Sequence, residues 1–77
     1  MFKGKKALVA GGAGFIGANL TMRLANLGCA VKATLRSRPP VFKHPMVEYH
    51  HADLTKMDVC KAMVEGMDYV FLCAANT

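Results

Sequence analysis

Long apolar runs and paired cysteines are both missing from this 77-residue chain. Its longest apolar stretch, residues 7–18, has 12 residues and four glycines, whereas a membrane-spanning helix needs about 20 apolar residues. Lysines ahead of that stretch resemble the start of a signal peptide, but the glycines would break its apolar helix. Three cysteines without a Cys-x-x-Cys pair exclude a complete disulfide framework. We therefore expect reduced thiols, a cytoplasmic location and no membrane partner.

Acidic side chains are absent from the first part of the chain. Residues 1–47 carry eight basic and no acidic side chains, and residues 48–77 carry two basic and five acidic ones, giving net charges of +8 and −3. This asymmetry predicts a polyanionic partner for the first part: nucleic acid, an anionic membrane or a phosphate-bearing small molecule. A solvated basic surface that binds nothing is the alternative.

The apolar pattern predicts four strands and two helices. Strands are expected at residues 7–10, 31–35, 47–51 and 69–73, and the first and last of these read as strands buried on both faces. The first helix is expected to begin at Phe15 and to close at Gly28, a residue that adopts the left-handed conformation of a helix end without strain. Its apolar face is predicted to comprise Ile16, Leu20, Leu24 and Leu27.

A second helix is predicted between the third and fourth strands. Thr55 is expected as its N-cap in a capping box with Asp58, and the helix should end near Gly66. Its apolar face is predicted to comprise Cys60, Met63, Val64 and Met67. Strands that alternate with helices indicate an α/β fold with a parallel sheet.

The segment between the first strand and the first helix is rich in glycine. Residues 11–17, Gly-Gly-Ala-Gly-Phe-Ile-Gly, contain both GxGxxG and GxxGxxG. Between a strand and a helix, such glycines allow a tight turn and a close approach of a pyrophosphate to the backbone at the positive end of the helix. A P-loop is excluded because no Gly-Lys-Ser/Thr follows. The alternative is a glycine-rich turn without a ligand.

The end of the second predicted strand has arginines where a dinucleotide fingerprint usually has an acid. An acid there would bind the ribose 2′-hydroxyl of NAD, whereas Arg36 and Arg38 can pair with the 2′-phosphate of NADP. We therefore expect NADP as the cofactor, with NAD as the alternative. Solvated arginines without a ligand would be the simpler explanation.

These motifs resemble the extended short-chain dehydrogenase/reductase superfamily, in its NAD(P)-dependent epimerase/dehydratase group. The resemblance rests on the glycine motif, on Asp53-Leu54 and on residues 71–75, Phe-Leu-Cys-Ala-Ala. It implies that Asp53 binds the adenine amino group with Leu54 beside the ring, and that Ala74 and Ala75 line the path to the nicotinamide ribose. The expected cofactor-binding residues are Gly11, Ala13, Gly14, Phe15, Ile16, Gly17, Arg36, Arg38, Asp53, Leu54, Ala74 and Ala75.

A Rossmann-type sheet with strand order 3-2-1-4, incomplete at the fourth strand, is the expected topology. Right-handed crossovers would then put the two helices on opposite faces. The order would also put Gly11 beside residues 73–75, at a switch point where ligands bind. Residues 1–77 are thus expected to be the amino-terminal part of one dinucleotide-binding domain.

The superfamily's catalytic Tyr-x-x-x-Lys pair is absent, because Tyr49 precedes Asp53 and Tyr69 precedes Cys73 at that spacing. We therefore expect no catalytic residue here and no turnover by this segment alone. It looks like an amino-terminal fragment of a homodimeric oxidoreductase or nucleotide-sugar epimerase/dehydratase that acts on a nucleotide-sugar or another small carbonyl or hydroxyl compound.

Three other interpretations of the sequence are a metal site, a nucleic-acid-binding protein and a module without catalysis. No metal is expected, since the adjacent His50 and His51 point to opposite faces of a strand and His44 and Asp53 complete no ligand spacing. No nucleic acid is expected either, because aromatic residues are not interleaved with the basic ones. A non-catalytic NADP sensor or protein-interaction module remains the alternative function.

Overall fold

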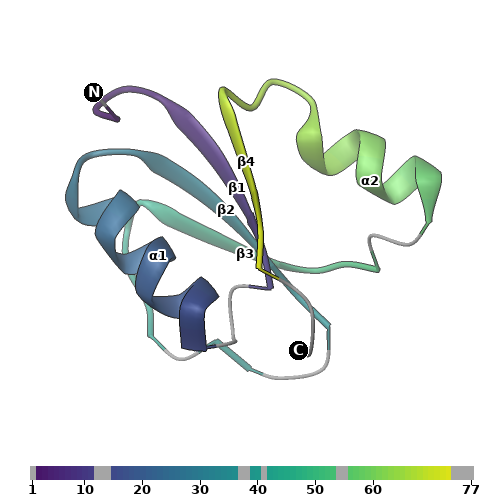
Figure 1. Ribbon diagram of the computed structural model, residues 1–77, viewed down its shortest axis with the longest axis horizontal. Helices are drawn as coiled ribbons and strands as arrows, with labels where there is room; N and C mark the ends of the chain where they lie inside the picture. The colour runs from purple at the N-terminus through teal and green to yellow at the C-terminus, as the bar shows by residue number, and fades with distance from the viewer. Residues whose placement is uncertain (1, 12–14, 37–38, 41, 54–55, 74–77) are drawn as a thin grey trace.

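The structure is a computed structural model that describes residues 2–11, 15–36, 39–40, 42–53 and 56–73. Its elements are β1 (Lys6–Ala10), α1 (Phe15–Asn26), β2 (Ala30–Leu35), β3 (Val47–His51), α2 (Met57–Val64) and β4 (Tyr69–Leu72). All paired strands are parallel and lie in the order β3-β2-β1-β4, which confirms the predicted topology. Figure 1 shows α1 and α2 on opposite sides of the strands, also as predicted.

Strand β1 lies at the centre of the sheet and of the core. Its residues 7–10 are fully buried, because β2 and β4 flank the strand and α1 packs against β1 and β2. On the α1 side, Ala7 and Val9 cluster with Leu24 and Cys29. An unbroken apolar run therefore predicted this strand correctly, since both of its faces must be apolar.

The buried face of α1 differs from the predicted one. Its buried residues are Gly17, Ala18, Thr21, Leu24 and Ala25. Two members of the predicted apolar face, the first and the last, are instead exposed, and of that face only Leu24 is fully buried. Four of the five buried side chains are small, which allows the helix axis to lie close to the strands. The largest apolar side chains of α1 are therefore a poor guide to its packing.

The end of α1 is closed by Gly28, as predicted. This glycine has φ +86°, and its N–H donates to the carbonyl oxygen of Ala25 at 3.0 Å. The next N–H, of Cys29, donates back to the carbonyl oxygen of Leu24 at 3.0 Å. This pair of bonds is a Schellman motif, which satisfies carbonyls that the helix end would leave open.

The start of α2 corrects one sequence prediction. The N-cap position is Lys56, with no side-chain cap hydrogen bond, so the helix begins one residue later than a cap at Thr55 would give; Thr55 itself lies outside the described residues. The helix ends at Val64, with Glu65 as its C-cap and Gly66 at φ +78°, which confirms the predicted end near Gly66. No residue of α2 is fully buried. The predicted amphipathic face is therefore only partly covered in this chain.

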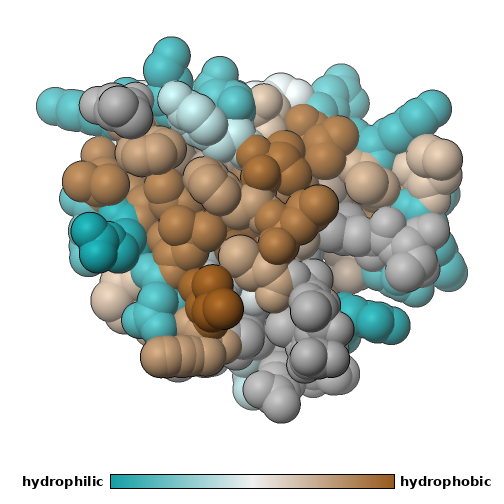
Figure 2. All heavy atoms as spheres, in the orientation of Figure 1, coloured by the Kyte–Doolittle hydropathy of each residue, from teal (hydrophilic) through white to brown (hydrophobic). Residues whose placement is uncertain are grey.

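Strand β4 was predicted to be buried on both faces, and this is wrong for the chain as described. Tyr69 and Phe71 pack toward the core beneath α1, whereas Val70 and Leu72 are 44% and 80% exposed. Within the described sheet β4 pairs with β1 alone and so forms an edge. Figure 2 shows apolar side chains gathered over the part of the surface where α1 and β4 lie. One face of this apolar strand is therefore covered by the core, and the other face is exposed.

Candidate functional site

The carboxyl ends of the four strands meet at one edge of the sheet. Because the strands are parallel, the residues that follow them come together. The N–H of Cys73, after β4, donates to the carbonyl oxygen of Ala10 in β1 at 2.9 Å, and that of Ala52, after β3, donates to Leu35 in β2 at 3.0 Å. Gly11, directly after β1, therefore lies between the ends of β2 and β4, as expected from the topology.

Gly11 begins the glycine-rich turn in a conformation that favours glycine. Its φ is +88°, in the region where a side chain would be strained. Its N–H lies 3.2 Å from the carbonyl oxygen and 3.3 Å from the Oγ1 of Thr34. Thr34 is almost fully buried in β2. The turn is thus fixed to the neighbouring strand at its first residue.

Helix α1 begins at Phe15, four residues after Gly11. Phe15 and Ile16 are 74% and 73% exposed, whereas Gly17 is buried in the first turn of the helix. The Thr21 hydroxyl donates to the Gly17 carbonyl oxygen at 2.7 Å. The described first turn contains no acid, so nothing in it opposes an anion at the positive end of the helix.

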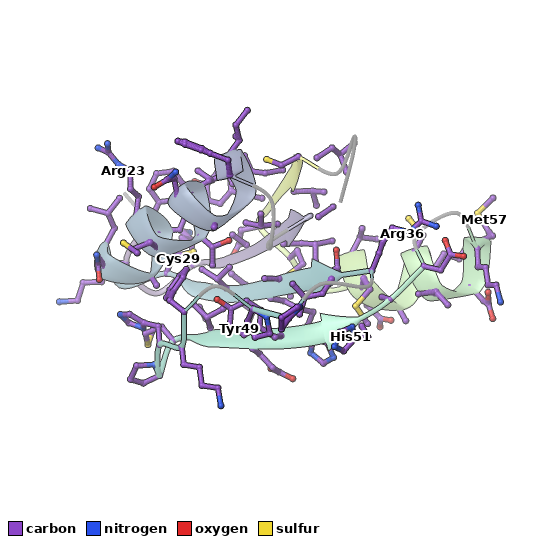
Figure 3. All side chains as sticks on the ribbon, turned by 90° about the horizontal axis from the view of Figure 1, so that it is seen from below. Arg23, Cys29, Arg36, Tyr49, His51 and Met57 are labelled. Atoms are coloured by element: carbon purple, nitrogen blue, oxygen red, sulfur yellow. The ribbon has the colours of Figure 1, made fainter. Side chains whose placement is uncertain are left out.

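A second part of the site lies beyond β2 and β3. Arg36, His51, Ala52 and Asp53 line an open depression of about 330 Å³. Figure 3 shows Arg36 and His51 at the same end of the strands. The Arg36 side chain is exposed and Asp53 is half-buried, with an interaction inside the protein. Two predicted cofactor residues, Arg36 and Asp53, are therefore brought together.

Half of the predicted cofactor residues cannot be placed. Those that lie outside the described residues are Ala13, Gly14, Arg38, Leu54, Ala74 and Ala75. Sequence reasoning missed Thr34 and His51 as site residues. Thr34 sits inside an apolar run, and His51 reaches the site through the pairing of β3 with β2. The strand periodicity that separates His51 from His50 was the available signal.

Two further hollows lie away from this edge. One, of about 500 Å³, runs along the amino ends of β1–β3 and includes Lys6, Lys32 and Met67. The other, of about 490 Å³, includes Pro40, His44 and Tyr49. Neither Gly11, the described residue of the glycine turn, nor Arg36 lines either hollow. The carboxyl edge therefore remains the candidate site, because it combines the turn, the helix start and a guanidinium.

The tyrosines do not form a catalytic pair in the described part of the chain. The Tyr49 hydroxyl is buried without a hydrogen-bond partner among the described residues, and burial raises the pKa of that phenol. A catalytic tyrosine of the resembled superfamily needs the opposite shift. Among the same residues, no group of three or more His, Cys, Asp or Glu side chains could hold a metal ion, and no helix there has the length and apolarity to cross a bilayer.

Comparison with known proteins identifies the family. The model of the NAD dependent epimerase/dehydratase family matches residues 7–77. This chain therefore belongs to that family, as its glycine motif and sheet order had indicated. The family's name specifies NAD, a nicotinamide dinucleotide.

Individual relatives include both dehydrogenases and epimerases. A 3 beta-hydroxysteroid dehydrogenase/Delta 5-->4-isomerase of Mycobacterium tuberculosis is 43% identical over 70 residues, 91% of this chain and 19% of that protein. The solved structure of an epimerase from Methanothermobacter thermautotrophicus has a TM-score of 0.87 and 34% identity, over 97% of this chain and 24% of its own. A UDP-galactose 4-epimerase has a TM-score of 0.76 and 39% identity, over 94% and 24%. The chain thus spans about a fifth to a quarter of these relatives.

Proposed function

We propose that this chain is the amino-terminal, cofactor-binding part of a Rossmann domain in an NADP-dependent oxidoreductase or epimerase. The observation that carries the proposal is the convergence of Gly11, the start of α1 and Arg36 at one edge of the sheet. A dinucleotide has a pyrophosphate for the first two and a ribose phosphate for the third. The bound cofactor would supply hydride transfer, and the residues described here would hold it.

The preference for NADP rests on charge at the end of β2. This strand runs Ala-Val-Lys-Ala-Thr-Leu and is followed by Arg36, so no carboxylate stands where NAD enzymes hold the 2′-hydroxyl. The Arg36 guanidinium is exposed at the depression and can pair with a phosphate through two N–H groups. Asp53 faces the same depression and would bind the adenine amino group.

The remaining predicted site residues would contact the pyrophosphate, the adenine ring and the nicotinamide ribose. Gly11 and Gly17 would let the pyrophosphate approach the backbone, since a side chain would be strained at Gly11 and Gly17 is buried in the first turn of α1. Ala13, Gly14, Phe15 and Ile16 would complete the turn and the helix start, and Arg38 would add a second guanidinium. Leu54 would pack beside the adenine ring, and Ala74 and Ala75 would line the path to the nicotinamide ribose.

The substrate would be a compound with an oxidisable hydroxyl or a reducible carbonyl, such as a nucleotide-sugar. The names of the relatives cover steroid dehydrogenation and sugar epimerisation, which both involve such groups. We further propose that the parent enzyme is a cytoplasmic homodimer. An NADP sensor without turnover is the second candidate, and it would be favoured if the full-length protein that contains this chain had no Tyr-x-x-x-Lys pair.

Titration of the full-length protein that contains this chain tests the proposal. Fluorescence of the reduced cofactor is followed as protein is added to NADPH and, separately, to NADH. We expect NADPH to bind at least about tenfold more tightly than NADH, because a charged hydrogen-bonded pair contributes about 1.5–3 kcal/mol. Equal affinities would contradict the NADP preference, and no binding of either would contradict the cofactor site. Turnover of a hydroxyl or carbonyl substrate would then separate an enzyme from a sensor.

A further inference from the structure

His51 shares the depression at the carboxyl edge with Arg36. It is the last residue of β3, and its Cα pairs in parallel register with that of Leu35, the residue before Arg36. His51 and Arg36 are both exposed, and both residues line the depression of about 330 Å³. The pairing of β2 with β3 continues one step further through the Ala52 N–H, which donates to the Leu35 carbonyl oxygen. The sheet therefore fixes the backbone of His51 beside the end of β2, directly before Arg36.

A phosphate in the depression would be bound more tightly by two hydrogen-bond donors than by one. Among the described residues, the charged groups at the depression are Arg36 from the end of β2 and Asp53 after β3, and Tyr49 lies two residues before His51 on the same face of β3. Asp53 has a partner inside the protein. An imidazole ring can donate one hydrogen bond when neutral and two when protonated.

We propose that His51 is a second ligand of the ribose 2′-phosphate of bound NADP(H), acting together with Arg36. The inference rests on the proposed function, because it concerns the same cofactor at the same edge. NADH, which has a hydroxyl in place of the phosphate, gains nothing from His51.

The neighbouring histidine provides a matched control. His50 precedes His51 in β3, and successive side chains of a strand point to opposite faces. Its Nε2 lies 2.9 Å from Oε1 of Glu48 on that opposite face, and His50 does not line the depression. His50→Ala therefore removes the same side chain from the same strand without touching the proposed phosphate site.

Cofactor titration of the full-length protein tests the assignment. We expect His51→Ala to weaken NADPH binding about 5- to 10-fold, as for the loss of one charge-assisted hydrogen bond at a partly exposed site, and to change NADH binding less than about twofold. His50→Ala should leave both unchanged. If His51→Ala binds NADPH like the wild type while Arg36→Ala is weakened, the role of His51 is wrong and the cofactor site stands. If the wild type binds neither cofactor, the proposed function itself fails.

A conservative variant adds a readout that a structural role would not change. His51→Gln keeps a hydrogen-bond donor of similar reach, so it should retain more of the NADPH affinity than His51→Ala does. A glutamine variant that binds NADPH no better than the alanine variant would overturn the proposal.

Discussion

The N–H of Gly11 is shared by two acceptors of Thr34, the carbonyl oxygen at 3.2 Å and Oγ1 at 3.3 Å. Both residues are buried, and they stand at the carboxyl ends of neighbouring strands. This contact directs the Gly11 donor to β2, so it holds the start of the turn and is not available to a ligand. The start of the glycine-rich turn is therefore held by a residue that is 23 positions away in the chain.

Replacement of Gly11 by alanine is expected to weaken both folding and cofactor binding. A Cβ at φ +88° is strained, which should lower the free energy of unfolding by about 1–2 kcal/mol. The distorted turn should also weaken NADPH binding. Denaturant unfolding and NADPH titration measure the two effects.

Gly4→Ala is the matched control for this substitution. Gly4 has a similar φ of +75°, and a Cβ there would have no atom within 4 Å. Its strain should lower stability by a similar amount, but NADPH affinity should be unchanged because Gly4 precedes β1 at the opposite end of the sheet. Equal loss of affinity in both variants would show that Gly11 acts only through stability.

Substitutions of Thr34 test the same contact through its acceptor. Thr34→Val keeps the shape and the backbone acceptor but removes Oγ1, so the free energy of unfolding should fall by about 0.5–1.5 kcal/mol. Thr34→Ser keeps the hydroxyl and should retain the NADPH affinity that Thr34→Val loses. Thermal unfolding with and without NADPH measures both quantities. A Ser variant that binds as poorly as the Val variant would refute a role for the hydroxyl.

The strand order could be predicted from the sequence more fully than the burial of individual side chains. Apolar runs and handed crossovers suffice for strand order, because they depend on local pattern and chain direction. The exposure of Ile16 and of Leu72 could not be predicted, since it depends on which neighbours reach each face. His51 joins Arg36 only through strand register, which a single sequence does not specify. The glycine turn was recognisable because its backbone requirement is local.

Reversal of the charge at Arg36 should reverse the cofactor preference. Arg36→Asp places a carboxylate where it can accept a hydrogen bond from the 2′-hydroxyl of NADH and repel the 2′-phosphate of NADPH. We expect NADPH to bind at least about tenfold more weakly and NADH to bind as well as before or better. Arg23→Asp is the control, since Arg23 is an exposed arginine in the last turn of α1. A preference for NADPH that survives Arg36→Asp would argue against the proposed phosphate site.

Stability should decrease in alkaline solution, in part through Cys29. Burial, and secondarily the negative charge of Asp68, raises the pKa of the Cys29 thiol. The folded state then holds the thiol proton more tightly than the unfolded state. The resulting stability is present below the ordinary thiol pKa of about 8.5 and is lost as the pH rises toward the raised value. Urea unfolding between about pH 7 and 10 should show a shallower loss in Cys29→Ala than in the wild type; identical slopes would contradict this assignment.

The most direct test of the central claim is a crystal structure of the full-length protein with NADPH. The account predicts the pyrophosphate at the glycine turn beside Gly11 and the start of α1, and the 2′-phosphate within hydrogen-bond distance of Arg36 and His51. A cofactor bound in the groove at the amino ends of the strands, near Lys6 and Lys32, would contradict it.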